Sequence, residues 1–440
     1  MNSVKSRLSL MMFLQYAVWG IWLPVLATYL QSPIVEGGLG FTSGQVGWII
    51  GVAASLGAVS APFMAGQFAD RHFSTEKFLC LLLIFGGVVK FVLSFQASFS
   101  AWLVLSVLYS ILYMPTLSLT NSMAFAHLEN VDNEWPRVRV MGTFGWIAAS
   151  WLFPMIWLQS NLEFQTLPPF FVGTEVVDAT SRLGDTLKVS GVISILYALY
   201  CLSLPNTPPN RKASEKLAFI KAFGLLSDKS FAVLILASLP IAIIHQIYFM
   251  QTGPFLENQL GLLVTYIAPA MTVGQFAEIG VMAILGVFIG RFGFRRTIAI
   301  GAFAYFARYL IWGLISLQEP SGPSVDALGQ FLWTVPLIIG VFSQLLHGVC
   351  YACFFAAAYM YVDKIADDDI RNSAQTVFGI IILGLGPMLA APLLVILSSL
   401  FGEVGVVTNF AGMWLSLAAI ALTTSVVFYG AFNDQAGSGK

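Results

Sequence analysis

The chain of 440 residues is 58% hydrophobic and 10% charged, and its formal net charge is −1. Its mean hydropathy is +0.81. This composition excludes a soluble globular protein, because too few polar side chains are present to cover its surface, and it indicates a polytopic membrane protein. The basic residues are spread over separate loops, which argues against a nucleic-acid partner.

Long apolar runs predict membrane-spanning helices, since a helix needs about 20 mainly apolar residues to cross a bilayer and a β-barrel would show short alternating strands. The first run has no small-residue cleavage pattern, so we expect a retained helix and not a signal peptide. The longest polar stretches are 159–187 and 206–229. Twelve helices are expected near residues 8–30, 43–64, 76–97, 100–127, 136–158, 188–205, 230–252, 264–290, 294–317, 328–360, 372–400 and 405–432.

The basic residues also predict the orientation of these helices. In a twelve-helix arrangement most of them fall on one side of the membrane, and only Arg182 and Lys188 fall on the other. By the positive-inside rule, both termini are then cytoplasmic.

A short loop motif occurs twice, six helices apart, as GQFADR at 66–71 and GVFIGR at 286–291. The glycine would allow close helix approach, although positive-inside anchors beside a glycine are an alternative. The repeat resembles the loop motif of major facilitator transporters, with Gly290 replacing the acid in the second copy. That resemblance implies an all-α integral membrane fold of twelve transmembrane helices in two six-helix pseudo-repeats. The expected parts are an N-terminal bundle 1–205, a cytoplasmic linker 206–229 and a C-terminal bundle 230–440.

Glu278 is the only carboxylate deep inside an apolar segment. A lone acid at membrane depth costs roughly 2.5–3.5 kcal/mol on insertion scales, so it usually faces a cavity or a bundle interior and takes part in transport. Gln275, three residues earlier, is its neighbour on the helix surface. Together they can bond sugar hydroxyls or base edges. The structural alternative for Glu278 is an ion pair with Arg308 of the ninth helix.

Several segments resemble the nucleoside:proton symporter family within the major facilitators. They are FLQYAVWGIWL (13–23), YMPTLSLTNS (113–122), PRVRVMGTFGW (136–146), QFAE (275–278) and IRNSAQ (370–375). The resemblance spans both halves of the chain. It implies a secondary active transporter that imports nucleosides with protons by alternating access. It also implies a monomer without a cofactor, in the bacterial cytoplasmic (inner) membrane.

Residue by residue, the resemblance implies that Arg139, Thr143 and Trp146 line the nucleoside site. Their spacing of i, i+4 and i+7 places a cation, a hydroxyl and a ring on one helix face. The alternative for Arg139 is a positive-inside anchor at a helix start. Gln246 of the seventh helix matches an amide that contacts substrate in the family, whereas Phe249 stands where a second amide is usual.

The tenth helix departs from the family pattern. His347 and Tyr351 match positions that line the site, but Ala352 stands at the position of the family's acidic residue. If that acid carries the coupled proton in relatives, this chain uses Glu278, a histidine or no proton at all. Glu278 is the candidate for proton coupling, and His347 is a second group that could titrate near neutral pH. His245 of the seventh helix is either a packing residue or a further site residue.

Lys90 and Arg308 lie at roughly equivalent places in the third and ninth helices. Either could neutralise Glu278, bind an anionic substrate or lie along a cavity wall. The Cys350–Cys353 pair lacks a zinc-site or redox context, so we expect structural thiols and no metal.

No phosphate-binding glycine loop, nucleophile elbow or nucleophile–base pair is apparent, so we expect neither an enzyme nor an ATP-driven pump. A major facilitator transporter of a sugar or another small polar metabolite remains an alternative. A membrane sensor without flux would need a soluble output region, for which the loops are too short.

Overall fold

The computed structural model describes residues 3–64, 73–208, 228–326, 331–366 and 371–433. Within them, nine helices are long and apolar enough to cross a membrane. One of these, α13 (Val264–Ile315), has 52 residues, enough to cross twice, and it bends at Gly293, where φ is 75°. Each expected segment coincides with a helix or with consecutive helices. The predicted all-α membrane fold is confirmed.

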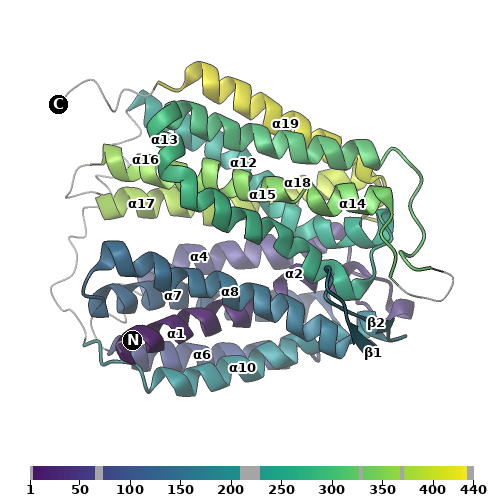
Figure 1. Ribbon diagram of the computed structural model, residues 1–440, viewed down its shortest axis with the longest axis horizontal. Helices are drawn as coiled ribbons and strands as arrows, with labels where there is room; N and C mark the ends of the chain where they lie inside the picture. The colour runs from purple at the N-terminus through teal and green to yellow at the C-terminus, as the bar shows by residue number, and fades with distance from the viewer. Residues whose placement is uncertain (1–2, 65–72, 209–227, 327–330, 367–370, 434–440) are drawn as a thin grey trace.

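The helices of the first half of the chain lie together in one layer, the lower one in Figure 1. The first expected segment breaks at Ile21 and Trp22 into two helices, and the second contains a π-helical segment, Trp48–Val52. The bounds are α1 Ser3–Gly20, α2 Leu23–Gln31, α3 Ser43–Gly47, α4 Ala53–Phe63, α6 Thr75–Leu93, α7 Phe99–His127, α8 Val131–Trp157 and α10 Asp185–Cys201.

The helices of the second half form the other layer. Besides α13, their bounds are α12 Lys229–Pro254, α14 Val335–Phe342, α15 Leu345–Val349, α16 Ala357–Ile365, α17 Arg371–Gly379, α18 Gly386–Leu400 and α19 Phe410–Ala431. π-Helical segments extend or interrupt three of the expected spans, at Phe255–Gln259, Cys350–Ala356 and Ile380–Leu385.

Short polar residues fix where several of these helices begin. Thr42 accepts a hydrogen bond from the Gln45 backbone N–H at 3.2 Å, and the Gln45 side chain accepts one from the Thr42 N–H at 2.9 Å. This reciprocal capping box starts α3. Asp228 and Asn409 start α12 and α19 by accepting from the backbone N–H three residues later, at 2.8 and 2.9 Å.

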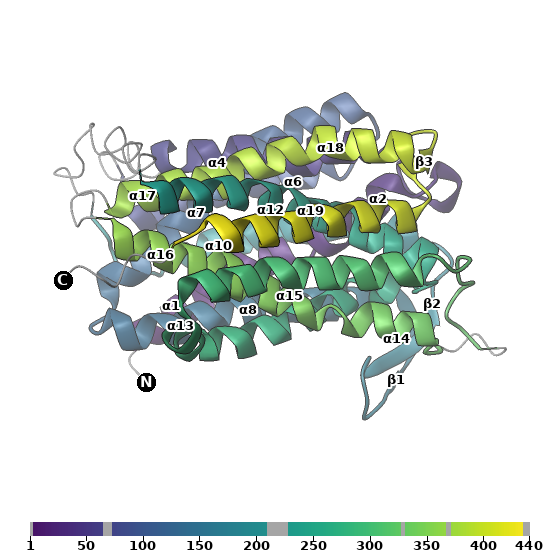
Figure 2. The same cartoon turned by 90° about the horizontal axis from the view of Figure 1, so that it is seen from above.

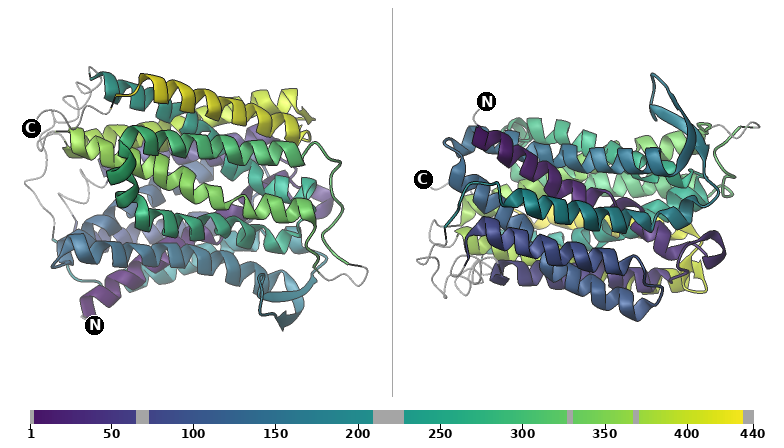
Figure 3. Two further views of the ribbon diagram at one scale, coloured as in Figure 1. Left: turned by 45° about the horizontal axis from the view of Figure 1, so that its top comes forward. Right: turned by 90° about the horizontal axis from the view of Figure 1, so that it is seen from below.

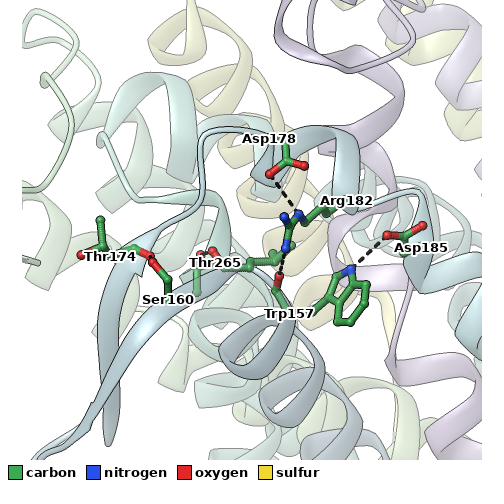
Figure 4. Close-up of polar contacts among 8 residues, drawn as sticks. Trp157, Ser160, Thr174, Asp178, Arg182, Asp185 and Thr265 are labelled. Carbon is green, nitrogen blue, oxygen red and sulfur yellow. Dashed lines mark hydrogen bonds and ion pairs between the residues drawn. The ribbon is translucent and has the colours of Figure 1, made fainter.

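The polar stretch 159–187 contains secondary structure that its composition did not predict. An antiparallel hairpin of β1 (Gln159–Phe164) and β2 (Phe171–Glu175) is followed by the short helix α9 (Ala179–Arg182). Within the hairpin, the Ser160 hydroxyl donates to the Thr174 carbonyl at 3.3 Å (Figure 4).

Polar contacts fix the start of the hairpin to the rest of the first half (Figure 4). Arg182 pairs with Asp178 at 2.9 Å and donates to the Trp157 carbonyl at 3.1 Å. The indole N–H of Trp157 donates to Asp185 at 2.9 Å. Because Trp157 ends α8 and Asp185 begins α10, the hairpin starts from a fixed corner between two membrane helices.

The loop motif is only partly described by the structure. Its first copy, 66–71, lies outside the described residues, as do residues 209–227 of the expected linker. In the second copy, a Cβ atom built on Gly286 or Gly290 would meet no atom of the described residues within 4 Å. The expectation that Gly286 permits close helix approach is therefore wrong, because this glycine faces open space.

The start of α1 and the end of α19 lie at one end of the molecule, and the β1–β2 hairpin lies at the opposite end (Figures 1 and 2). We name these the terminal end and the hairpin end. At the hairpin end, hydrogen bonds join the two halves. The Gln31 side chain donates to the Met250 carbonyl and accepts from the Gln251 amide, both at 3.2 Å. The indole N–H of Trp151 donates to the Thr272 hydroxyl at 2.7 Å.

At the terminal end, two polar contacts among the described residues each lie within one half. Lys5 of α1 pairs with Glu134 of α8, and Arg295 of α13 donates to the Tyr429 carbonyl of α19. The long helices of both halves run between the two ends (Figure 3). Each half is therefore fixed internally at its terminal end, and the halves are tied to each other at the hairpin end.

Candidate functional site

A cavity of about 350 Å³ lies between the two halves and takes its lining from both. Its volume is in the range of small-molecule sites in proteins. All eight predicted site residues line it, and they are Arg139, Thr143, Trp146, Gln246, Gln275, Glu278, His347 and Tyr351. Residues separated widely in the sequence thus meet at one place.

The wall from the first half is aromatic and carries a cation. Trp19 packs edge-on against Trp146, with ring centroids 5.6 Å apart, and it also contacts Tyr16 at 6.5 Å. The guanidinium carbon of Arg139 lies 4.3 Å from the centroid of the Tyr16 ring. This stacking positions Arg139 inside the cavity, so the alternative of a simple positive-inside anchor does not describe its environment.

Close helix packing brings Trp146 to this wall. A Cβ atom on Gly20 would lie 2.8 Å from the backbone of Trp146, so only glycine allows α8 to approach α1 this closely. The sequence marked Trp146 as a site residue but gave no role to Tyr16 or Trp19. Both lie within segment 13–23, which resembles the family, and this resemblance could have identified them as site residues.

The wall from the second half carries the amide and acid groups beside its own rings. Gln275 and Glu278 share one face of α13, and both line the cavity. The side-chain oxygen of Gln275 is buried and has no hydrogen-bond partner among the described residues. A buried acceptor left unpaired costs about 1–3 kcal/mol, so this atom is prepared for a donor from a ligand.

Glu278 is half-buried on the cavity wall and interacts electrostatically with Arg139 across the cavity. Its surroundings depend on a glycine of the tenth segment. A Cβ atom on Gly348 would meet the backbone of Ala277 and Glu278. Glycine at this position therefore lets α15 lie directly against the turn of α13 that carries the acid.

Arg308 is not the partner of Glu278. Its Nη1 lies 2.7 Å from Nδ1 of His347, and its Nη2 donates to the Tyr309 hydroxyl at 3.2 Å. In the part of the chain that the structure describes, no ion pair joins Arg308 to Glu278. Because a guanidinium can only donate, Nδ1 of His347 accepts, and Nε2 carries the proton of a neutral imidazole.

The seventh segment contributes a second histidine and an amide. Nδ1 of His245 lies 2.7 Å from the Tyr305 hydroxyl, and its ring stacks 5.5 Å from that of His347. The Gln246 amide donates to the Ile50 carbonyl of the other half at 3.3 Å. Gln246 therefore bridges the halves beside the cavity. His245 lines the cavity as well, which was one of the two expectations for it.

The sequence of the whole chain matches a known family of transporters. The model of the family described as Nucleoside H+ symporter matches residues 1–436. The chain belongs to this family of nucleoside:proton symporters. It is similar to the putative nucleoside transporter YegT of Escherichia coli (strain K12), with 30% identity over 440 residues that cover 98% of this chain and 94% of that protein. The xanthosine permease of the same organism is 26% identical over 447 residues, covering 98% of this chain and 96% of that one.

Solved structures agree on the fold. A mutant of the nucleoside transporter NupG superposes with a TM-score of 0.81 at 21% identity, over 98% of this chain and 100% of that one. The peptide transporter POT superposes at 0.70 with 14% identity, over 97% of this chain and 93% of that one. The symporter fold is thus shared with transporters of other named substrates. Membership in a family of transporters agrees with the expectation that the chain is not an enzyme.

Within this symporter, the departure at Ala352 has a simple structural meaning. Ala352 is fully buried in the π-helical segment and does not line the cavity, whereas Tyr351 does. Among the described residues that line the cavity, Glu278 is the only carboxylate. A proton carried on an acid inside this cavity has Glu278 as its available site.

Proposed function

We propose that this symporter imports nucleosides together with protons through the cavity between its halves. The observation that carries the proposal is that Glu278 and the unpartnered oxygen of Gln275 lie side by side on the cavity wall. The aromatic wall that contains Trp146 lies opposite them. Carboxylate and amide acceptors match the hydroxyl groups of ribose. The aromatic rings on the facing wall can stack on the base of a nucleoside.

Each predicted site residue has a role in this proposal. Trp146 stacks on the base, with Arg139 and Thr143 on the same helix face bonding its edge. Gln275 and Glu278 bond the ribose hydroxyls, and Glu278 also carries the coupled proton. His347 donates from Nε2 as a neutral group, because Nδ1 is already bonded to Arg308. Gln246 and Tyr351 complete the polar lining.

The transport cycle follows from the placement of the contacts between the halves. We assign the terminal end to the cytoplasm, as the basic residues predict, within the bacterial inner membrane. The hydrogen bonds at the hairpin end then close the outer side, and access is from the cytoplasm. Rocking of the bundles 1–205 and 230–440 about the cavity, with 206–229 as the connection, alternates access. One protomer contains the whole cavity, so we propose a working monomer.

Uptake of radiolabelled uridine and adenosine into proteoliposomes tests this function. Uptake should accelerate with an inward proton gradient, and an uncoupler should remove that acceleration. Competition experiments distinguish this function from transport of a sugar or another polar metabolite. Unlabelled nucleosides should inhibit uptake of the labelled nucleoside, whereas free ribose and other sugars should not. Uptake of neither nucleoside, together with uptake of a sugar, would replace the proposal with transport of another polar metabolite.

A further inference from the structure

Lys90 is a cation on the cavity wall that the proposed function does not use. It lies in the last turn of α6, its side chain is only 3% exposed, and it lines the same cavity as Glu278 and Arg139. Its Nζ lies 3.4 Å from the centroid of the Trp22 ring and 3.7 Å from that of Tyr109. The two rings hold the ammonium group at a defined point.

The ammonium group of Lys90 lacks a partner for its hydrogen atoms. Among the described residues, Lys90 has no ion pair, and no hydrogen bond from Nζ is formed. Ring faces attract the positive charge, but the group has three N–H donors, and buried charges in proteins are otherwise paired. A ligand oxygen that entered the cavity would satisfy these donors.

Arg308, the equivalent cation of the second half, shows the contrast. It too is surrounded by aromatic rings, with its guanidinium carbon 4.4 Å from the centroid of Tyr248. It also bonds His347 and Tyr309, and it does not line the cavity. Arg308 thus has protein partners at Nη1 and Nη2, and only its Nε lacks one among the described residues, whereas Lys90 presents its donors to the substrate space.

The balance of charge in the cavity favours a negatively charged ligand. Lys90 and Arg139 are its two cations, and Glu278 is the only carboxylate among the described lining residues. When Glu278 takes up the coupled proton, two positive charges remain without a negative one. A substrate with one negative charge reduces this excess, which is costly in a cavity removed from water.

Aromatic rings connect Lys90 to the proposed base-stacking residue. Tyr109 stacks on Tyr113 with centroids 5.3 Å apart, Tyr113 meets Trp19 at 5.9 Å, and Trp19 meets Trp146 at 5.6 Å. Tyr109 and Tyr113 are nearly parallel, at 11°, whereas Trp19 meets Tyr113 and Trp146 edge-on. The ring faces beside Lys90 suit a planar anion, which can stack on them, better than a tetrahedral phosphate.

We propose that Lys90 is an anion subsite of the cavity and that the transporter prefers nucleosides whose base carries one negative charge. This inference rests on the proposed function and names its substrate class. Uridine and orotidine form a suitable pair of probes, because they differ by one carboxylate on the base. Xanthosine and inosine form a second pair at slightly alkaline pH, where the xanthine base is ionised and the hypoxanthine base is neutral.

The experiment measures inhibition of radiolabelled uridine uptake by each unlabelled nucleoside in proteoliposomes. In the wild-type protein, orotidine and xanthosine should inhibit at concentrations about tenfold lower than uridine and inosine, as one charge-assisted hydrogen bond predicts. In Lys90→Met this preference should vanish, and in Lys90→Arg it should persist. Lys77→Met, an exposed lysine of the same helix, is the matched control and should keep the preference.

A second readout needs no variant. Import of a neutral nucleoside with one proton moves a charge, so an inside-negative potential should accelerate uridine uptake. Import of an anionic nucleoside with one proton is electroneutral, so the same potential should leave orotidine uptake unchanged.

The outcomes separate this inference from the proposed function. Absence of any nucleoside uptake would overturn the function itself. Normal uridine uptake without stronger inhibition by orotidine or xanthosine would overturn only the role of Lys90. A preference for these anionic nucleosides that survives Lys90→Met would also overturn that role. Stronger inhibition by uridine monophosphate than by orotidine would overturn the preference for a planar anion and would indicate a phosphate subsite instead.

Discussion

Nδ1 of His347 lies 2.7 Å from Nη1 of Arg308, and this contact fixes the protonation of a histidine on the cavity wall. A guanidinium can only donate, so the imidazole accepts at Nδ1 and is neutral. Because His347 is thereby engaged as an acceptor, it is poorly suited to carry the coupled proton. Proton coupling then depends on Glu278, and this dependence leads to the first prediction.

Glu278→Gln should abolish uptake driven by the proton gradient while retaining exchange of labelled for unlabelled nucleoside. The amide keeps the shape and the hydrogen bonds of a protonated acid but cannot release a proton. Parallel measurements of gradient-driven uptake and of exchange test this. Glu403→Gln, an exposed acid of the hairpin end, should behave as the wild type. Gradient-driven uptake that survives Glu278→Gln would exclude Glu278 as the coupling site.

Gln275→Leu should raise the KM for ribonucleosides by roughly tenfold to a hundredfold, because a ribose hydroxyl loses a buried acceptor worth about 1–3 kcal/mol. The loss should be much smaller for nucleosides that lack the bonded hydroxyl, so a series of deoxynucleosides identifies which hydroxyl it is. Gln96→Leu, outside the cavity, is the control. An equal loss for ribo- and deoxynucleosides would assign Gln275 to the base instead.

Gly348→Ala should reduce transport at least about tenfold without unfolding the protein. The added methyl group would meet backbone atoms of Ala277 and Glu278, so α15 must move away from α13. Such a displacement misplaces the groups that bind the substrate and lowers the transport rate. Gly286→Ala, where the new atom meets nothing within 4 Å, should retain full transport. Thermal denaturation of both variants separates loss of activity from loss of fold, and a fully active Gly348→Ala would refute the close packing.

Glu175 should make closure of the hairpin end depend on pH. It accepts hydrogen bonds from the Thr265 backbone N–H at 2.8 Å and from the Thr265 hydroxyl at 2.7 Å, which joins the hairpin to the start of α13. Burial raises the pKa of Glu175 above its ordinary value of 4.5, although these hydrogen bonds oppose the shift. Opening would expose the carboxyl to water and return its pKa toward that value.

The closed form therefore binds the proton more tightly, so acidification favours closure. The effect is complete below pH 4.5 and is lost as the pH rises through the raised pKa. Spin labels at positions 163 and 319, on opposite halves of the hairpin end, report the separation by pulsed electron paramagnetic resonance. A shift toward short distances at acidic pH is expected, and Glu175→Gln should remove it. An unchanged pH response in that variant would assign the effect to another group.

The sequence predicted the architecture well because membrane helices leave a strong apolar signal. It also singled out Glu278, since an acid inside an apolar segment is visible in the sequence. The resemblance to the family singled out Arg139, Thr143 and Trp146, and their helical spacing agrees with it. The structure places all of them on the cavity wall. Their roles in binding stay predictions until transport is measured.

Contacts between distant segments could not be predicted from the sequence. The suggested pairing of Glu278 with Arg308 failed because Arg308 instead bonds His347, a partner that depends on how the ninth and tenth segments cross. The aromatic surroundings of Lys90 likewise join three segments. The β1–β2 hairpin was missed since its exposed residues lack the regular alternation of a half-buried strand.

The cavity described above is divided unequally between the halves. Both cations, Lys90 and Arg139, belong to the first half, whereas the acid and both amides belong to the second, and each half contributes aromatic rings. If the halves arose by duplication, each copy has since kept a different part of the chemistry. Neither copy could now revert to an independent homodimer with the same described cavity lining, because two first halves would lack the acid and two second halves would lack the cations.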